Sequence, residues 1–418
     1  MSKNKYLIAL CFWMLHISIL KAQTLSLDEL LDKIKKNHPQ LKMFDTDIQS
    51  MDAAAEGAKS WMPPQVQAGF FMTPYNPTFW ISDGEFTGMG NFMIGSTQMI
   101  PNAKKQRAEY EYMNAMSSLE KENKNYTINQ LYAIGKTNYY ELMILNKKAR
   151  KANENLLLLN YMIESMEIRY QYNMDKLPAY YKAKSNYSTL QNMIFMLENG
   201  MSQKMILLNT LMVRDKNISF EVDSTYTLVD FEYDLVDTTN LSKNRSDIKA
   251  IDKSIKLNQL KIEVEKTKFL PDFGIRYDHM FAFGQTPQQF TFMGMINIPM
   301  SWSTKMGKAN IKSYQIKNES LQWQKQMVLN EASGMILAMR TELDNLKNQY
   351  SIYEKSIIPA RRKNYDITLL AWQNNVGELF QVLDAWESLN MAELDLLDKL
   401  QQILVTQVEI EKQLEIEK

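Results

Sequence analysis

The sequence is poor in cysteine, glycine and proline, and it carries no net charge. Its 418 residues include 1 cysteine, 14 glycines and 11 prolines, and no stretch has the composition of a flexible linker. The 48 basic and 48 acidic residues balance, so nothing suggests electrostatic capture of nucleic acid, and no nucleic-acid partner is expected. These scarcities favour a long helical array over several separate domains.

Residues 1–22 have the pattern of a secretory signal peptide. Two lysines near the start are followed by an apolar run over 6–20, and Ala22 precedes a polar stretch. The run is too short for a membrane anchor, so we expect this segment to be cleaved. Cys11, the single cysteine, lies inside it. The mature chain is therefore expected to have no disulfide and no thiolate metal ligand.

The remaining sequence lacks the signals of a membrane-spanning helix and of a catalytic centre. No second apolar run approaches the roughly 18 residues of a spanning helix, so passage through a membrane would need strands closed into a barrel. His16, His38 and His279 are isolated from one another, and no nucleophile elbow, phosphate loop or paired-acid motif is present. We predict that the protein is not an enzyme and has no cofactor.

The chain contains an internal duplication. Around Asn37 it reads Asn-His-Pro-Gln-Leu-Lys, and around Asn244 it reads Asn-Arg-Ser-Asp-Ile-Lys. Each stretch runs into a helical pattern that ends at proline and continues as alternating residues. Four pairs of positions match at a single offset of 207 residues: Asn37 with Asn244, Leu41 with Ile248, Lys42 with Lys249 and Pro64 with Pro271. This agreement indicates a duplicated helix-to-strand unit.

Each half is predicted to repeat one series: a helix, two strands, a very long helix and a returning helix. The first structural repeat covers 23–240, with helices at about 39–60, 103–172 and 178–212, strands at about 65–74 and 86–100, and an equatorial segment at 213–240. The second covers 241–418, with helices at about 246–268, 303–372 and 379–415 and strands at about 272–283 and 290–302. Prolines that end the first helix of each half force the chain into an extended conformation.

The strand predicted at 272–283 alternates most clearly. One set of side chains is mostly aromatic or aliphatic and the other is smaller or polar, the period of two expected when one face meets lipid and the other a polar lumen. The first set is Phe273, Ile275, Tyr277, His279, Phe281 and Phe283, and the second is Gly274, Arg276, Asp278, Met280 and Ala282. A soluble hairpin packed on a core would show the same pattern, so the strands alone leave both interpretations open.

Breaks that contain asparagine separate each very long helix from its returning helix. Asn173 and Asn375 lie in these breaks, and asparagine tolerates the left-handed conformation that ends helices, so both breaks are predicted to be tight helical hairpins. The second long helix carries the spacing of a coiled-coil seam. The seam residues are Leu343, Leu346, Tyr350, Tyr353 and Ile357. Pro359 is expected to kink this helix.

Residues 371–385 read Ala-Trp-Gln-Asn-Asn-Val-Gly-Glu-Leu-Phe-Gln-Val-Leu-Asp-Ala. This stretch resembles the hairpin of the TolC-type outer-membrane efflux protein family, in which an aromatic-x-x-Gly turn leads into a Leu-Asp-Ala helix. The twin Asn-x-Pro-like starts and the twin helix-Pro-strand junctions resemble the same family. The resemblance covers nearly all of the chain beyond residue 22.

The resemblance implies a mainly α chain with a transmembrane β-barrel: a duplicated unit gives four strands and long coiled-coil helices per chain. Three copies would form a trimeric 12-stranded barrel continued by a periplasmic α-helical tunnel. Four strands cannot close a barrel alone, and an open edge in lipid leaves backbone groups unpaired, which agrees with several copies.

The same resemblance implies a passive outer-membrane exit duct of a tripartite efflux or secretion system. Its location would be the outer membrane, with a large periplasmic portion. Its partners would be two further copies of the chain, a periplasmic adaptor (membrane fusion) protein, an inner-membrane pump and outer-membrane lipid. A different class of function stays open, that of a soluble exported coiled-coil scaffold or binding protein.

Gating residues at the tunnel tip are expected beside the second hairpin. Asp384 lies about two helical turns beyond the second hairpin. Three copies around a three-fold axis would therefore bring like charges together. The resemblance implies a second acid one turn earlier, where this chain has Gln381, and Glu378 is the residue that would compensate. An ordinary solvated helix face is the alternative.

Other residues near the hairpins are expected to form the tips or to dock the adaptor. They are Asn173, Leu177, Asn375, Gly377, Leu379 and Phe380. Burial between neighbouring helices would explain the apolar members of this set equally well. Asn173 and Asn375 stand where the resemblance implies glycine, a difference that the turn tolerates but that affects the tip contacts.

Methionine is the one residue type in unusual excess, with 29 copies. Met280, Met293 and Met295 fall on predicted lumen-side positions of strands. Thioethers are soft ligands that suit Cu(I), so a copper- or silver-specific efflux duct is a further alternative. Methionine is also an adaptable packing residue, and the excess extends through the helices, so no metal site is predicted and these three are weak candidates only.

Overall fold

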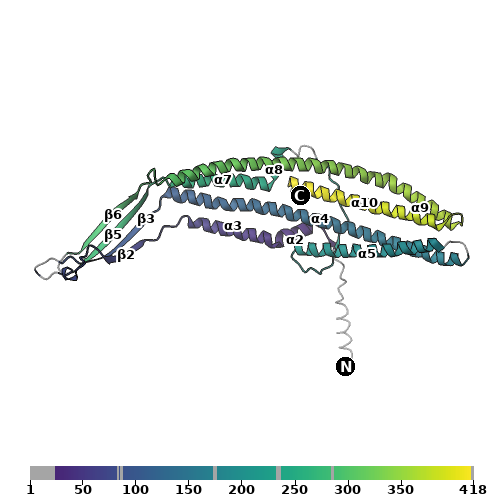
Figure 1. Cartoon of the computed structure of the whole chain (residues 1–418), viewed down its shortest axis with the longest axis horizontal. Coiled ribbons are helices and arrows are strands. Elements are labelled where there is room, and N and C mark those ends of the chain that lie inside the picture. Colours follow the sequence, from purple (N-terminus) through teal and green to yellow (C-terminus); the bar gives the residue numbers. More distant parts are fainter. Residues whose placement is uncertain are drawn as a thin grey trace, which may run out of the picture. The chain divides into compact units, whose positions relative to one another are not determined.

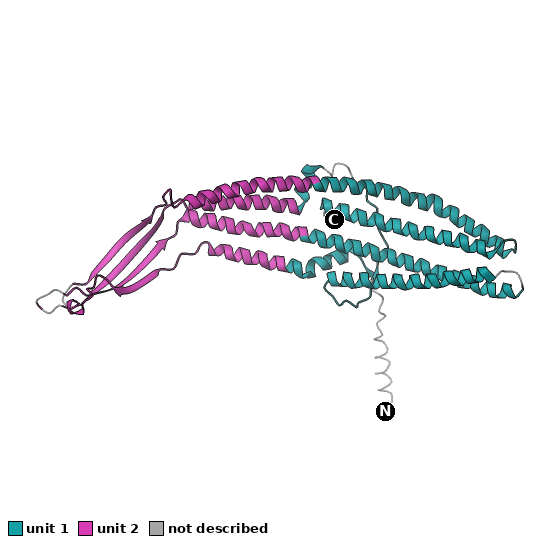
Figure 2. Cartoon of the chain, in the orientation of Figure 1, with its two compact units in different colours: residues 1–42, 127–245, 331–418 teal, residues 43–126, 246–330 magenta. Residues whose placement is uncertain are grey.

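The computed structural model describes residues 24–81, 84, 88–172, 177–231, 237–283 and 287–415. They belong to two compact units (Figure 2). Unit 1 comprises residues 1–42, 127–245 and 331–418, and unit 2 comprises residues 43–126 and 246–330. The order of helices and strands along the chain can be followed in Figure 1. The predicted signal segment lies outside the described residues.

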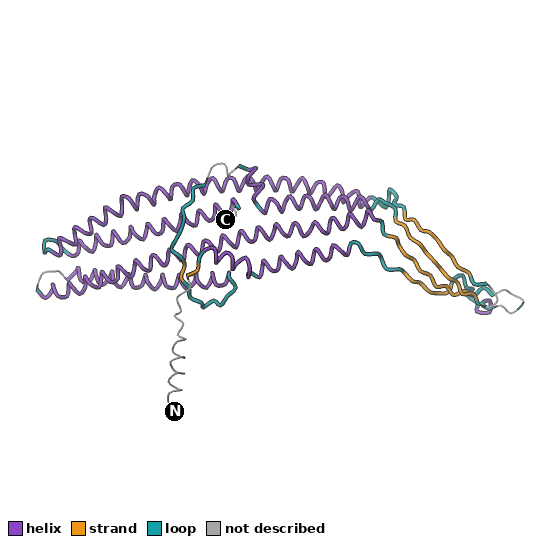
Figure 3. Tube along the Cα trace, turned by 180° about the vertical axis from the view of Figure 1, so that it is seen from behind, coloured by secondary structure: helices purple, strands orange, loops and turns teal. Residues whose placement is uncertain are grey.

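Unit 2 contains a four-stranded antiparallel sheet (Figure 3). Its strands are β2 (Gln65–Phe70), β3 (Asn91–Ile100), β5 (Asp272–Ala282) and β6 (Gln289–Asn297). The order across the sheet is β2-β3-β5-β6, so each half of the chain contributes one hairpin and the two hairpins join through β3 and β5. Strands β2 and β6 are the edges of this sheet, and their outer backbone groups have no strand beside them in the described chain.

Helices lead into and out of the sheet within unit 2. They are the later part of α3 (Pro39–Gly57), the start of α4 (Ala103–Gln171), α7 (Ser246–Thr267) and the start of α8 (Lys305–Ile352). Ile248 and Ile251 of α7 and Leu321 of α8 form a small buried cluster, because apolar residues spaced three or four apart share one face of a helix. This cluster joins α7 to α8 and fixes the helix that precedes β5.

Unit 1 is almost entirely helical. It holds α2 (Leu27–Asn37), α5 (Leu177–Leu211), α6 (Thr238–Asn244), α9 (Ile358–Gln373), α10 (Leu379–Leu414), the rest of α3, α4 and α8, and the short parallel strands β1 (Thr24–Leu25) and β4 (Glu221–Val222). One buried cluster surrounds Tyr139 and Leu404, and another surrounds Met162 and Leu383. Trp386 Nε1 donates to Asn155 Oδ1 at 2.9 Å, which ties α10 to α4 inside the second cluster.

Every helix and strand expected from the sequence has a counterpart, with some shifted ends. The strand expected at 65–74 ends at Phe70, and the one expected at 86–100 begins at Asn91. The segment 213–240 contains β4 and the start of α6. Each compact unit combines pieces of both sequence halves, so the division into two structural repeats stays a prediction. Within the described chain, no helix combines the length and the apolarity needed to cross a membrane.

Helix α2 was not expected, although its local signals are strong. The Ser26 hydroxyl accepts a hydrogen bond from the Glu29 N–H at 3.2 Å, which caps the first turn. Leu30 and Ile34 lie one turn apart and are fully buried. The helix ends at Asn37 because the following His38-Pro39 step cannot continue it.

The helix type changes locally just before Pro359, the residue at which the sequence predicted a kink. A π-helical turn, Tyr353–Ile357, separates α8 from α9, and Pro359 lies in the first turn of α9. Proline has no N–H and its ring crowds the preceding turn, so one wider turn relieves the conflict. Leu343 and Leu346 of the predicted seam are buried, at 2% and 3% exposure.

Tyr139→Phe is expected to destabilise unit 1. The Tyr139 hydroxyl donates to Leu25 O at 3.0 Å and accepts from the Asp223 N–H at 3.1 Å, so it joins β1 to the chain after β4. Loss of the hydroxyl removes both bonds and leaves only the longer bond from the Asp223 N–H to Leu25 O at 3.4 Å, so the free energy of unfolding should fall by about 0.5–1.5 kcal/mol. Denaturant titration of the purified chain measures this. Tyr140→Phe is the control, because the Tyr140 hydroxyl makes no hydrogen bond to a described residue, and an equal loss there would contradict the assignment.

The same hydroxyl predicts a pH dependence. Burial raises the pKa of Tyr139 to about 12, from 10.0 for an ordinary tyrosine. The protonated Tyr139 hydroxyl therefore makes its full contribution to stability below pH 10. This contribution is lost as pH rises through 12, and the free energy of unfolding falls by at most about 1.4 kcal/mol per pH unit. Denaturant titrations of the Tyr139→Phe variant across this range should lack this component of the alkaline loss.

Candidate functional site

The two faces of the sheet differ in chemistry. The apolar face carries Val66 and Phe70 of β2, Ile94 and Ile100 of β3, Phe273, Ile275, Tyr277 and Phe281 of β5, and Phe290, Phe292 and Ile296 of β6. The exposed fractions of these side chains run from 39% to 71%. No described segment covers them as a core would, so the apolar face is turned outward.

The polar face carries the opposite set of side chains. It comprises Gln65 and Gln67 of β2, Thr97 of β3, Arg276, Asp278 and Met280 of β5, and Thr291, Met293 and Met295 of β6. Asp278 is its centre and is only 2% exposed. Its carboxylate accepts from Arg276 Nε at 2.8 and 3.0 Å, and from Gln67 Nε2 at 3.4 Å. The charge is therefore paired and hydrogen-bonded, as a buried carboxylate must be.

The separation of the two sets along β5 agrees with the alternation read from the sequence. Phe273, Ile275 and Tyr277 lie on the apolar face, and Arg276 and Asp278 lie on the polar face. In a sheet packed on a soluble core, the aromatic set would be the covered one. Here the charged set is the shielded one, an inversion that suits an apolar surrounding.

Gly95→Ala is expected to destabilise the sheet. Gly95 lies directly opposite Asp278, and a Cβ at Gly95 would be 2.0 Å from Asp278 Oδ1. The carboxylate would have to leave Arg276 or the strands would have to separate, at a cost of about 1–3 kcal/mol. Gly69→Ala on β2 is the control, because a Cβ there meets no atom within 4 Å. Equal thermal midpoints for the two variants would contradict this account.

Of the two predicted helical hairpins, the one between α9 and α10 has its turn within the described residues. Asn375 has φ 60°, the left-handed conformation that the sequence predicted for it. The N–H groups of Val376 and Gly377 both donate to Ala371 O, at 2.9 and 3.1 Å, which closes the end of α9. A Cβ at Gly377 would be 3.0 Å from Ala371 Cβ, so the turn is closed tightly there. Asn173, in the other hairpin, lies outside the described residues.

The apolar residues expected to dock an adaptor differ in exposure. Leu177 is 43% exposed and Phe380 is 45% exposed, so both side chains are accessible in the single chain. Leu379 is 1% exposed and packs in the cluster around Leu383, which agrees with the alternative that it is buried between neighbouring helices. The reason is helix geometry: Leu379 shares the inward face of α10 with Val382 and Leu383.

Asp384 is paired within its own chain. Its carboxylate forms an ion pair with Lys182 of α5, and Lys182 Nζ also lies 3.8 Å from Glu387 and 4.3 Å from the centre of the Phe380 ring. Glu378 and Gln381 are exposed six and three residues before Asp384, at the start of the same helix. Any charge that Asp384 presents is thus partly compensated, which the sequence did not indicate.

Arg169 of α4 makes a second contact across the hairpins. Its guanidinium donates to Asn375 Oδ1 at 2.7 Å and to Trp372 O at 3.3 Å, and lies 4.8 Å from the Trp372 ring centre. Lys182 and Arg169 were both missed by the sequence analysis. Their partners lie about 200 residues away along the chain, so no local spacing could have found them.

The candidate metal ligands share the polar face without forming a defined centre. Met280 lies opposite Gln289, Met293 opposite Arg276 and Met295 opposite Gly274. In the described part of the chain, no group of three or more His, Cys, Asp or Glu residues is arranged to hold a metal ion. Metal specificity through thioethers stays a hypothesis.

The fold was compared with known proteins. Neither a protein-family model nor a curated protein matches the sequence. Among solved structures, the outer membrane protein VceC from Vibrio cholerae is 15% identical with a TM-score of 0.72, over 93% of this chain and 96% of that one. The open-state MtrE outer membrane channel of Neisseria gonorrhoeae is 14% identical with a TM-score of 0.70, over 93% and 88%. CusC, a protein that forms a transmembrane channel, is 14% identical with a TM-score of 0.74, over 93% of this chain and 91% of that one.

These likenesses extend over almost the whole chain, although few residues are identical. They agree with the long helices, the small antiparallel sheet and the helical hairpin described above. The chain has the fold of the outer-membrane channel proteins.

Proposed function

We propose that the chain is the subunit of an outer-membrane exit duct, a passive channel of a tripartite efflux or secretion system. The observation that carries this proposal is the sheet with an outward apolar face and a shielded Arg276–Asp278 pair. Soluble proteins rarely expose an apolar patch of more than a few hundred Å². Lipid is the surrounding in which aromatic and aliphatic side chains face out and charged ones face a lumen.

The edges of the sheet support a closed ring of copies. Strands β2 and β6 each have one row of backbone groups that no described strand satisfies. In lipid, such groups must be paired, so β6 of one copy joins β2 of the next. Three copies of four strands give a 12-stranded barrel, the number that the family resemblance implies. We therefore propose a homotrimer in the outer membrane, with its helices in the periplasm as the family resemblance implies.

The helical hairpins form the periplasmic end in this proposal. A periplasmic adaptor and an inner-membrane pump dock there, with Leu177 and Phe380 as accessible apolar contacts. Asp384, Gln381 and Glu378 line the tip as gating residues, and Lys182 moderates the charge of Asp384. Cargo passes without chemical change, so the protein is not an enzyme.

The proposal is tested by locating the protein and measuring its conductance. Full-length protein expressed in a Gram-negative host should appear in outer-membrane fractions as trimers that become monomers on heating. Purified trimers should produce stepwise conductance in planar lipid bilayers. Recovery as a soluble periplasmic monomer without channel activity would instead favour the coiled-coil scaffold.

A further inference from the structure

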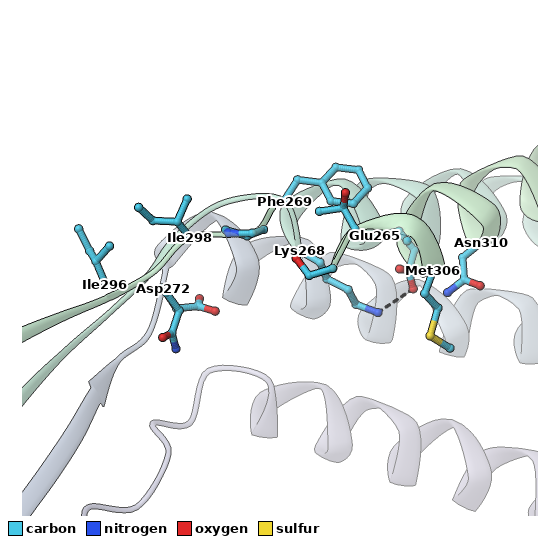
Figure 4. Close-up of a pocket in the computed structure, with 13 residues that line it drawn as sticks. Glu265, Lys268, Phe269, Asp272, Ile296, Ile298, Met306 and Asn310 are labelled. Atoms are coloured by element: carbon cyan, nitrogen blue, oxygen red, sulfur yellow. Dashed lines mark hydrogen bonds and ion pairs between the residues drawn. The ribbon is translucent and has the colours of Figure 1, made fainter. Parts of the chain in front are cut away.

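A cavity of about 570 Å³ lies in unit 2 at the end of the sheet where β5 begins and β6 ends. Its walls come from the end of α7, the start of α8 and the chain after β6. Figure 4 shows Glu265 and Lys268 joined by an ion pair, with Met306 beside them and Ile298 toward the strands. Phe269 adds to the apolar part of the wall. The cavity therefore combines an apolar wall with a carboxylate.

A second carboxylate at the cavity, that of Asp272, already has a cation. Lys105 Nζ lies 2.5 Å from Asp272 Oδ1 and both donates a hydrogen bond to this oxygen and balances its charge. Glu265 differs, because one of its oxygens has no donor. It is 3% exposed, its Oε1 accepts from Lys268 Nζ at 2.7 Å, and its Oε2 is buried without a donor among the described residues.

A buried charged acceptor without a donor is costly, so a donor from outside the single chain would stabilise this site. A neighbouring residue that is large and apolar enough to contact the wall, and that carries one N–H, fits the cavity.

The strand directions place one such residue at the same end of the sheet. Asn297, the last residue of β6, pairs with Asp272, the first of β5, so the cavity adjoins the edge formed by β6. Gln65, the first residue of β2, pairs with Thr97 near the end of β3. The segment before β2 therefore lies at the cavity's end of the sheet, at the opposite edge.

Trp61 is an exposed aromatic residue of that segment. Its side chain is 62% exposed, while the backbone on either side is held by Gln106 Nε2 to Ser60 O at 3.2 Å and Gln98 Nε2 to Met62 O at 2.9 Å. The Trp61 indole N–H has no acceptor among the described residues. An indole presents a large apolar ring, which suits the apolar wall of the cavity, and a single N–H donor, which Glu265 Oε2 lacks.

Lys59, the other strong donor nearby, is already engaged. Its ammonium forms an ion pair with Glu56 at 2.9 Å and lies 4.0 Å from the centre of the Tyr110 ring. The Ser60 hydroxyl donates to Gly57 O within its own chain. Between residues 59 and 64, Trp61 is thus the residue with a free side-chain donor in the described chain.

We propose that the cavity of one copy receives the Trp61 side chain of the next copy, whose indole N–H donates a hydrogen bond to Glu265 Oε2. The inference rests on the proposed function, because closing a ring sets the β2 edge of one copy beside the β6 edge of its neighbour. The ring packs on Phe269, Ile298 and Met306, and the donor completes the ion pair of Glu265 and Lys268. The site is incomplete in a single chain.

Cross-linking of paired cysteines tests the contact. In a Cys11→Ser background the chain has no native cysteine, so Trp61→Cys with Asn310→Cys can be treated with a short bis-maleimide. The expected result is covalent dimers and trimers on denaturing gels. The matched control combines Trp61→Cys with Trp323→Cys, which is 70% exposed on α8 outside the cavity, and should stay monomeric.

The outcomes separate this contact from the proposed function. Heat-modifiable trimers that give only monomers after treatment of the Trp61 and Asn310 pair would overturn the contact and leave the duct intact. Equal cross-linking by the control pair would overturn it as well. Failure of the parent chain to form trimers at all would overturn both proposals.

A double-mutant cycle tests the hydrogen bond. Trp61→Phe keeps an aromatic ring and removes the donor, and Glu265→Gln removes the charged acceptor. Each single variant should lower the dissociation temperature of the trimer by several degrees, and the double variant should lower it little further. Additive losses would show that Trp61 acts elsewhere, for example at the lipid interface, and would overturn the proposal.

Discussion

Phe292→Arg should abolish accumulation of trimers in the outer membrane, whereas Thr291→Arg, one residue earlier, should leave them intact. Phe292 is 65% exposed on the apolar face, so each copy would place a guanidinium against lipid. Arginine on the lipid face of a barrel costs about 2–4 kcal/mol near the midplane, and three copies multiply the cost. Outer-membrane fractionation followed by unheated gels measures the amount of trimer.

Thr291→Arg is a closely matched control. It adds the same side chain to the same strand, but on the polar face, where Thr291 lies opposite Asp278. The added guanidinium meets a carboxylate instead of lipid, so assembly should persist while the selectivity of the lumen changes. Loss of trimers in both variants, or in neither, would contradict the assignment of the two faces and with it the membrane role of the sheet.

Patterns that are local in the sequence predicted the strands and helices well. The alternation from Phe273 to Ala282 identified both β5 and the side chains that share each face, because the period of two is a property of any strand. Asn375 was correctly predicted to adopt a left-handed turn for the same reason: the preference belongs to the residue itself. Contact of one face with lipid stays a proposal, because a strand that faces a soluble core has the same alternation.

Features that depend on distant partners were not predictable in this way. Gly95 is constrained by Asp278, which lies on another hairpin, and only the register between β3 and β5 brings them together. Leu379 was expected to be a docking residue because it is apolar and next to a turn, yet the packing of α10 turns it inward. Helix α2 is a different case, since the capping residue Ser26 and the acidic Glu29 are local signals that mark its start.

Lys182→Gln should raise the preference of the duct for cations severalfold. Lys182 is the ion-pair partner of Asp384 and lies near Glu387, so its loss leaves two carboxylates per copy without their common cation. An exposed ion pair contributes only about 0.2–1 kcal/mol to stability, so assembly should be unaffected. In a trimer, three such changes occur around one axis, and a ring of acids selects cations.

The reversal potential of purified trimers in a salt gradient measures this selectivity. Lys184→Gln removes the same charge from the same helix, but the Lys184 ammonium lies 5.6 Å from the centre of the Tyr180 ring and pairs with no described carboxylate. It should therefore leave the potential nearly unchanged. Adding Asp384→Asn to Lys182→Gln should restore the original value, because the uncompensated charge is removed. An unchanged potential in Lys182→Gln would place Asp384 away from the conduction path, so the tip of α10 would be a solvated surface and not a gate.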